Sequence, residues 1–239
     1  AVYSAELLAG IAELAARHRL VVFADEIYDQ MLYDGARFIP MATVVHDTLC
    51  VTMSGLSKVY RACGYRVGWA VLSGNMRVAP DYLASLELLS SLRLCSNVPA
   101  QWAVQTALGG YQSVKELITP GGRLYESRRA VVAAAASSRF LMLAPPQGAM
   151  YAFVRVRTDE LPQFDDHTFA LDLLERKHVL VAPGVSFNVP YRDHFRVTTL
   201  PDSAMLQKVF VRIEELLGEY VSSPQSARPT LVEARKRFK

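Results

Sequence analysis

The chain has 239 residues, of which 51% are hydrophobic and 21% are charged, a balance typical of a globular protein with a sizeable core. Charged residues interrupt every apolar stretch before it reaches the roughly 18 residues of a membrane span, so we expect no membrane partner. The start of the chain has no basic region and no cleavage pattern, so we expect no secretory signal. The net charge of +3 is too weak to indicate a nucleic-acid partner.

The three cysteines, Cys50, Cys63 and Cys95, form an odd number and have no CxxC spacing. This pattern fits a reducing compartment, and we therefore expect a cytoplasmic protein without a disulfide framework. The five histidines lie apart in the sequence, with no HxxxH pair and no neighbouring cysteine cluster. We therefore expect no metal site.

The first part of the sequence predicts a helix followed by strands. Residues 4–18 carry apolar side chains at helical spacing, and Ser4 provides an N-cap. Continuous apolar runs follow at residues 20–24, 49–53 and 67–72, and each ends in polar residues or glycine. Such runs are typical of strands that are buried on both faces and carry ligands at their carboxyl ends. The predicted fold class is α/β.

A long helical region precedes a change in texture. Residues 80–138 have helical periodicity, with breaks at Gly109 and at residues 119–122. Short strands then alternate with helices. The expected strands are residues 149–156, 179–182 and 195–199, and the expected helices are residues 168–178 and a helix that Asp202 caps.

These patterns predict three segments. We expect a partial large domain over residues 1–138 and a small C-terminal α+β domain over residues 139–221. Residues 222–239 are rich in proline, serine and charge, and we expect a disordered tail there.

Asp25, Lys58, Arg66 and Arg196 are the residues that suggest chemistry. Each has an ordinary alternative when taken alone: a loop acid, a surface lysine, an ion-pairing arginine and a charge on an edge strand. Together they supply what pyridoxal 5'-phosphate (PLP) requires, namely an amine for a Schiff base, a carboxylate that keeps the pyridine nitrogen protonated and a cation for the phosphate. The second guanidinium can bind a substrate carboxylate through two parallel hydrogen bonds.

Four motifs, in this order, resemble those of the fold type I, PLP-dependent class I and II aminotransferases. They are residues 24–28 (ADEIY), which resemble a DE-x-Y strand end, residues 54–58 (SGLSK), a lysine segment, residues 64–69 (GYRVGW), an arginine element, and residues 194–197 (HFRV), a substrate motif. The resemblance extends from residue 1 to about residue 220. It implies that the chain contains the C-terminal part of the family's PLP-binding large domain, followed by the family's small domain.

The resemblance also implies a role for each matched residue in cofactor binding. Lys58 would form the Schiff base and carry the proton between the substrate's α-carbon and the cofactor. Asp25 would pair with the pyridine nitrogen, and Tyr28 would bond to the ring hydroxyl. Arg66 and Ser57 would bind the phosphate.

Arg196 would bind the substrate α-carboxylate by the same resemblance. Residues 92–101 and 107–113 are similar to the bacterial glutamate–pyruvate (alanine) aminotransferases. This implies transfer of an α-amino group between an amino acid, L-alanine, and a 2-oxo acid, 2-oxoglutarate. A homodimer is implied for the full-length family.

Two departures from the family pattern leave alternatives open. Many members have a serine three residues before the lysine, where this chain has Gly55, so Ser54 or Ser57 would have to replace it. The chain also begins after the family's NPNNPTG segment. It is therefore either an aminotransferase or a catalytically inactive aminotransferase-like fragment that lacks the N-terminal half of the cofactor site. A lyase or synthase acting at the same site is a third reading.

Overall fold

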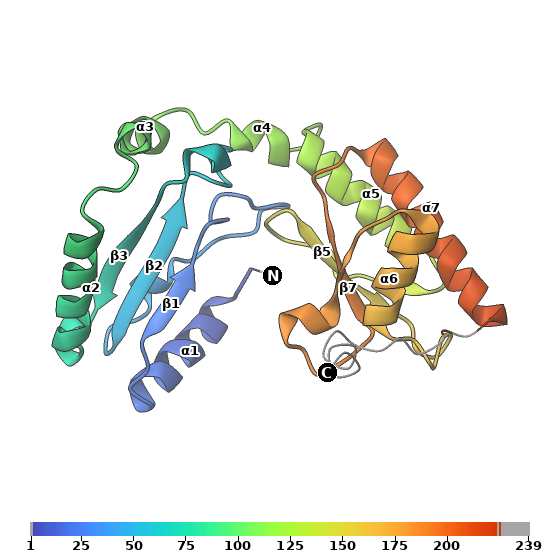
Figure 1. The fold of residues 1–239 in the computed structure, drawn as a ribbon, viewed down its shortest axis with the longest axis horizontal. Coiled ribbons are helices and arrows are strands. Elements are labelled where there is room, and N and C mark those ends of the chain that lie inside the picture. The colour runs from blue at the N-terminus through green and yellow to red at the C-terminus, as the bar shows by residue number, and fades with distance from the viewer. Residues whose placement is uncertain (1, 224, 226–239) are drawn as a thin grey trace, which may run out of the picture. The chain divides into compact units, whose positions relative to one another are not determined.

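The computed structural model describes residues 2–223 and residue 225, which fold into two compact units (Figure 1). Unit 1 comprises Ala1–Ile118 and Gln147–Ala149, and unit 2 comprises Thr119–Pro146 and Met150–Lys239. The boundaries of these units reflect which residues pack together. The domain boundary expected between residues 138 and 139 rests on the sequence pattern alone and stays a prediction. Most of the tail expected over residues 222–239 lies outside the described residues.

Unit 1 is built on a three-stranded sheet in the order β1-β2-β3. The strands are β1 (Val22–Asp25), β2 (Leu49–Gly55) and β3 (Gly68–Gly74). β1 runs parallel to β2, with Asp25 opposite Met53, and β3 runs antiparallel to β2, with Gly68 opposite Gly55. Short 3-10 turns lie at Met41–Thr43, Cys63–Tyr65 and Met76–Val78.

Helix α1 (Ala5–Arg17) covers one face of this sheet. The Ser4 hydroxyl accepts a hydrogen bond from the backbone N–H of Leu7 at 3.3 Å, so the predicted N-cap is confirmed. Leu8 of α1 joins a buried cluster that also contains Cys50 and Met41, with Val22 and Ala24 of β1 packed against it.

The opposite face of β1 is open. Phe23 makes an edge-on contact with Tyr82 of α2 (Pro80–Arg93), with 6.5 Å between the ring centroids, yet 57% of its surface remains exposed. The prediction that residues 20–24 form a strand buried on both faces is therefore wrong in its burial, because the contact with α2 leaves most of the Phe23 side chain uncovered. Two further helices complete unit 1, α3 (Val98–Gly109) and α4 (Val114–Ile118).

Unit 2 is an antiparallel sheet with its helices packed on one face. The strand order is β4-β5-β7-β6. The strands are β4 (Leu141–Met142), β5 (Tyr151–Val156), β6 (Ala182–Pro183) and β7 (His194–Thr198), and the helices are α5 (Arg123–Ser137), α6 (Asp166–Lys177) and α7 (Ser203–Ser222). The strand expected at residues 179–182 is shorter and begins only at Ala182.

Alternation along β5 and β7 sets the two faces of this sheet. Ala152, Val154, Phe195 and Val197 are buried in a cluster with side chains of all three helices. The intervening residues carry the polar and aromatic side chains of the other face. Helix α7 begins at Asp202, whose carboxylate accepts a hydrogen bond from Met205 N at 2.7 Å, so this predicted cap is also confirmed.

One carboxylate joins β5 to β7 on that polar face. Asp193 accepts a hydrogen bond from Arg155 Nε at 2.7 Å and lies 2.6 Å from His194 Nδ1. Burial opposes the ionisation of Asp193, but these two hydrogen bonds outweigh it and hold the pKa of the carboxyl below its usual value. The ionised Asp193 carboxylate therefore stabilises unit 2 through these two contacts.

We expect Asp193→Asn to lower the free energy of unfolding by about 1–2 kcal/mol at pH 7. Because the pKa of Asp193 is depressed, its stabilisation is present above the usual carboxyl pKa and is lost as the pH falls through the folded-state pKa. Urea denaturation at pH 7 and at acidic pH measures the difference, which should shrink in acid. Asp159→Asn removes an exposed carboxylate and serves as the control. An equal loss for Asp193→Asn at both pH values would contradict the prediction.

Candidate active site

The strand pairing of unit 1 brings three predicted site residues to one edge of the sheet. Asp25 is the last residue of β1, and Lys58 follows the end of the parallel strand β2. Arg66 precedes β3, which is antiparallel and so begins at the same edge. The sheet thus gathers an acid, an amine and a guanidinium at its carboxyl edge.

Buried neighbours fix the turn that carries Lys58. Leu56 and Val59 are 1% and 2% exposed, and Leu56 N donates a hydrogen bond to Val67 O at 3.1 Å. Arg61 N donates to Lys58 O at 3.0 Å, which closes the turn. Lys58 and Ser57 are themselves half-buried. Over residues 2–223 and 225, the Lys58 amine has no recorded ion pair or hydrogen bond, so it is available to a ligand.

The position of Gly55, at the end of β2, has no room for the serine that many family members carry there. A Cβ atom at this position would lie 2.8 Å from Val67 O and 3.0 Å from the Cα of Gly68. Both contacts are with backbone, so a serine would push β2 and β3 apart. A phosphate hydroxyl in this segment must therefore come from another residue, and Ser57 stays a prediction for that role.

Arg66 is held in a left-handed backbone conformation with φ of 53°. Its guanidinium donates to Cys63 O at 2.6 Å, and the side chain is exposed. The adjacent carbonyl of Tyr65 accepts a hydrogen bond from Asn97 Nδ2 at 3.0 Å, and Asn97 also caps α3 through Ala100 N. Asn97, the N-cap of α3, therefore ties this helix to the arginine segment.

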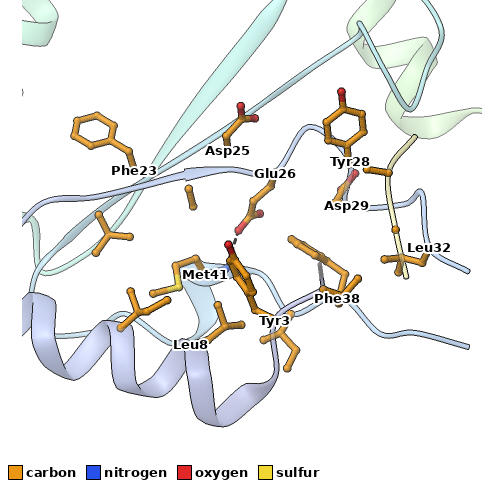
Figure 2. A pocket seen from close by; sticks show the side chains of 17 residues that line it. Tyr3, Leu8, Phe23, Asp25, Glu26, Tyr28, Asp29, Leu32, Phe38 and Met41 are labelled. Atoms are coloured by element: carbon orange, nitrogen blue, oxygen red, sulfur yellow. Dashed lines mark hydrogen bonds between the residues drawn. The ribbon is translucent and has the colours of Figure 1, made fainter. Parts of the chain in front are cut away.

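A cavity of about 510 Å³ lies beside β1 within unit 1 (Figure 2). Its polar lining comes from Asp25, Glu26, Tyr28 and Asp29, and apolar side chains such as Leu8 complete it. Asp25 and Glu26 point to opposite sides of the segment that carries them (Figure 2). The structure thus brings Asp25 and Tyr28, two predicted cofactor ligands, to one cavity.

The second acid of the DE pair has a structural partner. Glu26 Oε1 accepts a hydrogen bond from Met41 N at 2.8 Å, which ties the start of the 3-10 turn to the segment that follows β1. Burial raises the pKa of Glu26 above its usual value, and it raises the pKa of Asp29 in the same direction. The motif gave no signal for Asp29, since the DE-x-Y pattern ends one residue earlier.

Arg196 belongs to unit 2, where it lies on β7. Its guanidinium carbon is 4.3 Å from the ring centroid of Tyr151 and 4.6 Å from that of Phe187. In the part of the chain that the structure describes, no acidic side chain forms an ion pair with Arg196. The sequence motif located the arginine, but it carried no signal for the two rings.

Residues 2–223 and residue 225 contain no group of three or more histidine, cysteine and acidic side chains that could hold a metal ion. No helix among residues 2–223 is both long enough and apolar enough to span a bilayer.

A lysine, an acid and an arginine at one sheet edge of an α/β unit, with a small antiparallel unit in the same chain, agree with the aminotransferase resemblance of the sequence motifs. The chain belongs to the aminotransferase class I and II family, whose profile matches residues 1–213. It is 49% identical over 201 residues to the glutamate-pyruvate aminotransferase of Escherichia coli K12, and the matched region covers 84% of this chain and 50% of that relative. It is 43% identical over 220 residues to the alanine aminotransferase of Mycobacterium tuberculosis H37Rv, covering 92% and 51%.

Solved structures agree with this family assignment. A crystal structure of an aminotransferase from Escherichia coli matches with a TM-score of 0.87 and 44% identity, over 95% of this chain and 55% of that one. Alanine aminotransferase from Pyrococcus furiosus matches with a TM-score of 0.83 and 31% identity, over 92% and 55%. The predicted fold class is confirmed. The chain spans about half the length of the curated relatives that it matches.

We expect Gly55→Ser to lower the free energy of unfolding by about 1–3 kcal/mol, because the new Cβ meets the backbone of β3. Gly10→Ala is the matched control, since Gly10 lies in α1 with nothing within 4 Å of an added Cβ. The control should instead gain about 0.5–1 kcal/mol from helix propensity. Chemical denaturation of both variants measures these changes, and an unaltered Gly55→Ser protein would show that β2 and β3 separate without cost.

Proposed function

We propose that this chain provides the lysine-bearing part of a PLP-dependent aminotransferase site. The observation that carries the proposal is the position of Asp25, Lys58 and Arg66 along one edge of the sheet, in a chain 49% identical to a glutamate-pyruvate aminotransferase. The reaction would transfer an α-amino group between an amino acid and a 2-oxo acid. L-alanine and 2-oxoglutarate are the proposed pair, because the relatives include enzymes named for glutamate, pyruvate and alanine.

The residues at this edge fit PLP by their chemistry. The half-buried Lys58 amine has no recorded acidic partner over the described ranges, as an amine that must bond covalently to an aldehyde requires. Asp25 offers a carboxylate to the pyridine nitrogen, and Tyr28 in the same cavity offers a phenol to the ring hydroxyl. Arg66 and Ser57 are the proposed phosphate ligands. When bound, PLP supplies an electron sink for the carbon that loses its proton.

The chain's own residues then have distinct tasks. Lys58 would hold the cofactor and would move the proton at the substrate α-carbon. Asp25 would keep the pyridine nitrogen protonated through a charge-assisted hydrogen bond. Arg196 binds the substrate carboxylate, for which its unpaired guanidinium is suited.

A second candidate is an inactive aminotransferase-like fragment. It is supported by the open face of β1, where Phe23 is 57% exposed, and by the fact that the chain spans about half the length of its relatives. Phosphate and ring contacts beyond those of Asp25, Tyr28, Ser57, Lys58 and Arg66 would then be needed for turnover. Our hypothesis is that the family reaction belongs to a complete protein and that residues 1–239 alone have little or no activity.

Assembly and location are part of the same proposal. We propose a homodimer for the complete protein, and sedimentation velocity measures the oligomeric state. We propose a cytoplasmic location because Cys63 and Cys95 are exposed thiols without a disulfide partner.

We expect PLP added to the chain to produce a visible absorbance band that Lys58→Ala abolishes. Borohydride reduction followed by peptide mapping should locate the cofactor on Lys58, because Lys58 follows β2 at the edge of the sheet where β1 ends in Asp25. Lys208→Ala, which removes an exposed lysine on α7, is the control and should retain the band. Labelling spread equally over several lysines would contradict the proposal.

Turnover separates the two candidates. We expect incubation of PLP-loaded chain with L-alanine and 2-oxoglutarate to yield little pyruvate, since the chain spans about half the length of its relatives. Pyruvate formation well above the blank, and lost in Lys58→Ala, would instead establish residues 1–239 as an active enzyme.

A further inference from the structure

The face of the unit 2 sheet opposite its helices carries a continuous row of rings that ends at Arg196. His194 stacks on Phe153 with 4.9 Å between ring centroids, and Phe153 meets Phe187 edge-on at 5.7 Å. Phe187 in turn lies 4.6 Å from the guanidinium carbon of Arg196, which Tyr151 contacts at 4.3 Å. Both distances are within the range of a cation–π interaction.

Strand register places these groups on one face. Phe153 of β5 is directly opposite Arg196 of β7, and Tyr151 is opposite Thr198. Residues between them along each strand, such as Val197, face the core. Tyr151 therefore reaches Arg196 diagonally across the sheet, as long side chains on neighbouring strands do.

The turn that carries Phe187 is anchored from beneath. Val185 N donates a hydrogen bond at 2.7 Å to Asp166, a fully buried carboxylate at the start of α6. Gly184 allows the turn to approach β7, because a Cβ there would lie 2.8 Å from His194 O and 3.0 Å from Asp166 Oδ2. These contacts fix the backbone of Gly184–Phe187, so the ring of Phe187 has a defined place although 38% of it is exposed.

Rings and acids hold a guanidinium in different ways. An acidic side chain would occupy the N–H donors and cancel the charge, and a ligand would have to displace it. An aromatic face contacts the guanidinium plane and leaves the N–H groups along its edge free to bind a planar carboxylate. Arg196 has two ring contacts and, among the residues that the structure describes, no ion pair.

We propose that Phe187 and Tyr151 are positioning residues that hold Arg196 as an uncompensated receptor for a substrate carboxylate. This inference rests on the proposed role of Arg196 and deepens it by naming what orients the guanidinium. The ligand class is a 2-oxo or 2-amino carboxylate. The Asp166-anchored turn sets the position of one of the two rings.

The test is a titration of residues 1–239, isotope-labelled, with 2-oxoglutarate, followed through the Arg196 side-chain NMR signals. We expect Phe187→Leu to weaken binding about three- to tenfold and to move the Arg196 Hδ signals downfield, because the ring current is lost. Phe187→Tyr keeps the ring and should restore both. Thermal melting of each variant verifies that unit 2 remains folded.

Tyr191→Leu is the matched control. Tyr191 is 40% exposed on the same face, and its ring contacts His194 at 4.4 Å rather than Arg196. It should bind 2-oxoglutarate as the parent does, whereas Arg196→Leu should not bind. Parent-like affinity of Phe187→Leu, with binding lost in Arg196→Leu, would overturn the positioning role alone. Absence of binding in the parent, or binding unaffected by Arg196→Leu, would overturn the carboxylate role of Arg196 and this inference with it.

Discussion

The backbone pairing of β1 with β2 brings Asp25 to the edge of the sheet from which the turn with Lys58 emerges. The register sets Asp25 opposite Met53, and Glu26 N extends the pairing by donating to Met53 O at 2.8 Å. β1 thus ends at the level of Met53, whereas β2 continues for two further residues to Gly55, and the lysine turn follows just beyond Asp25 at the same edge. A shift by one residue would turn Asp25 to the face covered by α1, where Leu8 and Ala24 pack. The chemistry of the edge thus depends on hydrogen bonds made entirely by backbone.

Within the part of the chain that the structure describes, cationic side chains at the proposed binding positions lack the ion pairs that other cations form. Arg155 pairs with Asp193, and Arg176 pairs with Glu219 on α7, so these cations are neutralised within unit 2. Lys58 and Arg196 have no recorded ion-pair partner among the described residues. Unpaired cations are costly to bury, and each is only half-buried. The positive charges of Lys58 and Arg196 therefore remain free to attract anionic or carbonyl-bearing ligands.

Local signals in the sequence predicted the helix starts well, because a cap is decided within four residues. Ser4 and Asp202 both accept the backbone hydrogen bonds expected of N-caps. The motif series selected Asp25, Lys58 and Arg66, and the strand pairing brings them to one edge of the sheet. The partners that the sequence could not reveal are distant ones: the ring of Phe187 reaches Arg196 only through a turn anchored on another helix. The burial of β1 could not be predicted either, since an apolar run does not tell what covers each face of the strand.

The edge position of β1 has a consequence for the chain in solution. Its outward backbone groups, together with the exposed ring of Phe23, form a template onto which an extended segment of another molecule can add as a further strand. Such addition is second order in protein, so self-association and loss of solubility grow with concentration and are suppressed by dilution. Short charged stretches or prolines, which many natural edges use as protection, are absent from Val22–Asp25 apart from its final aspartate.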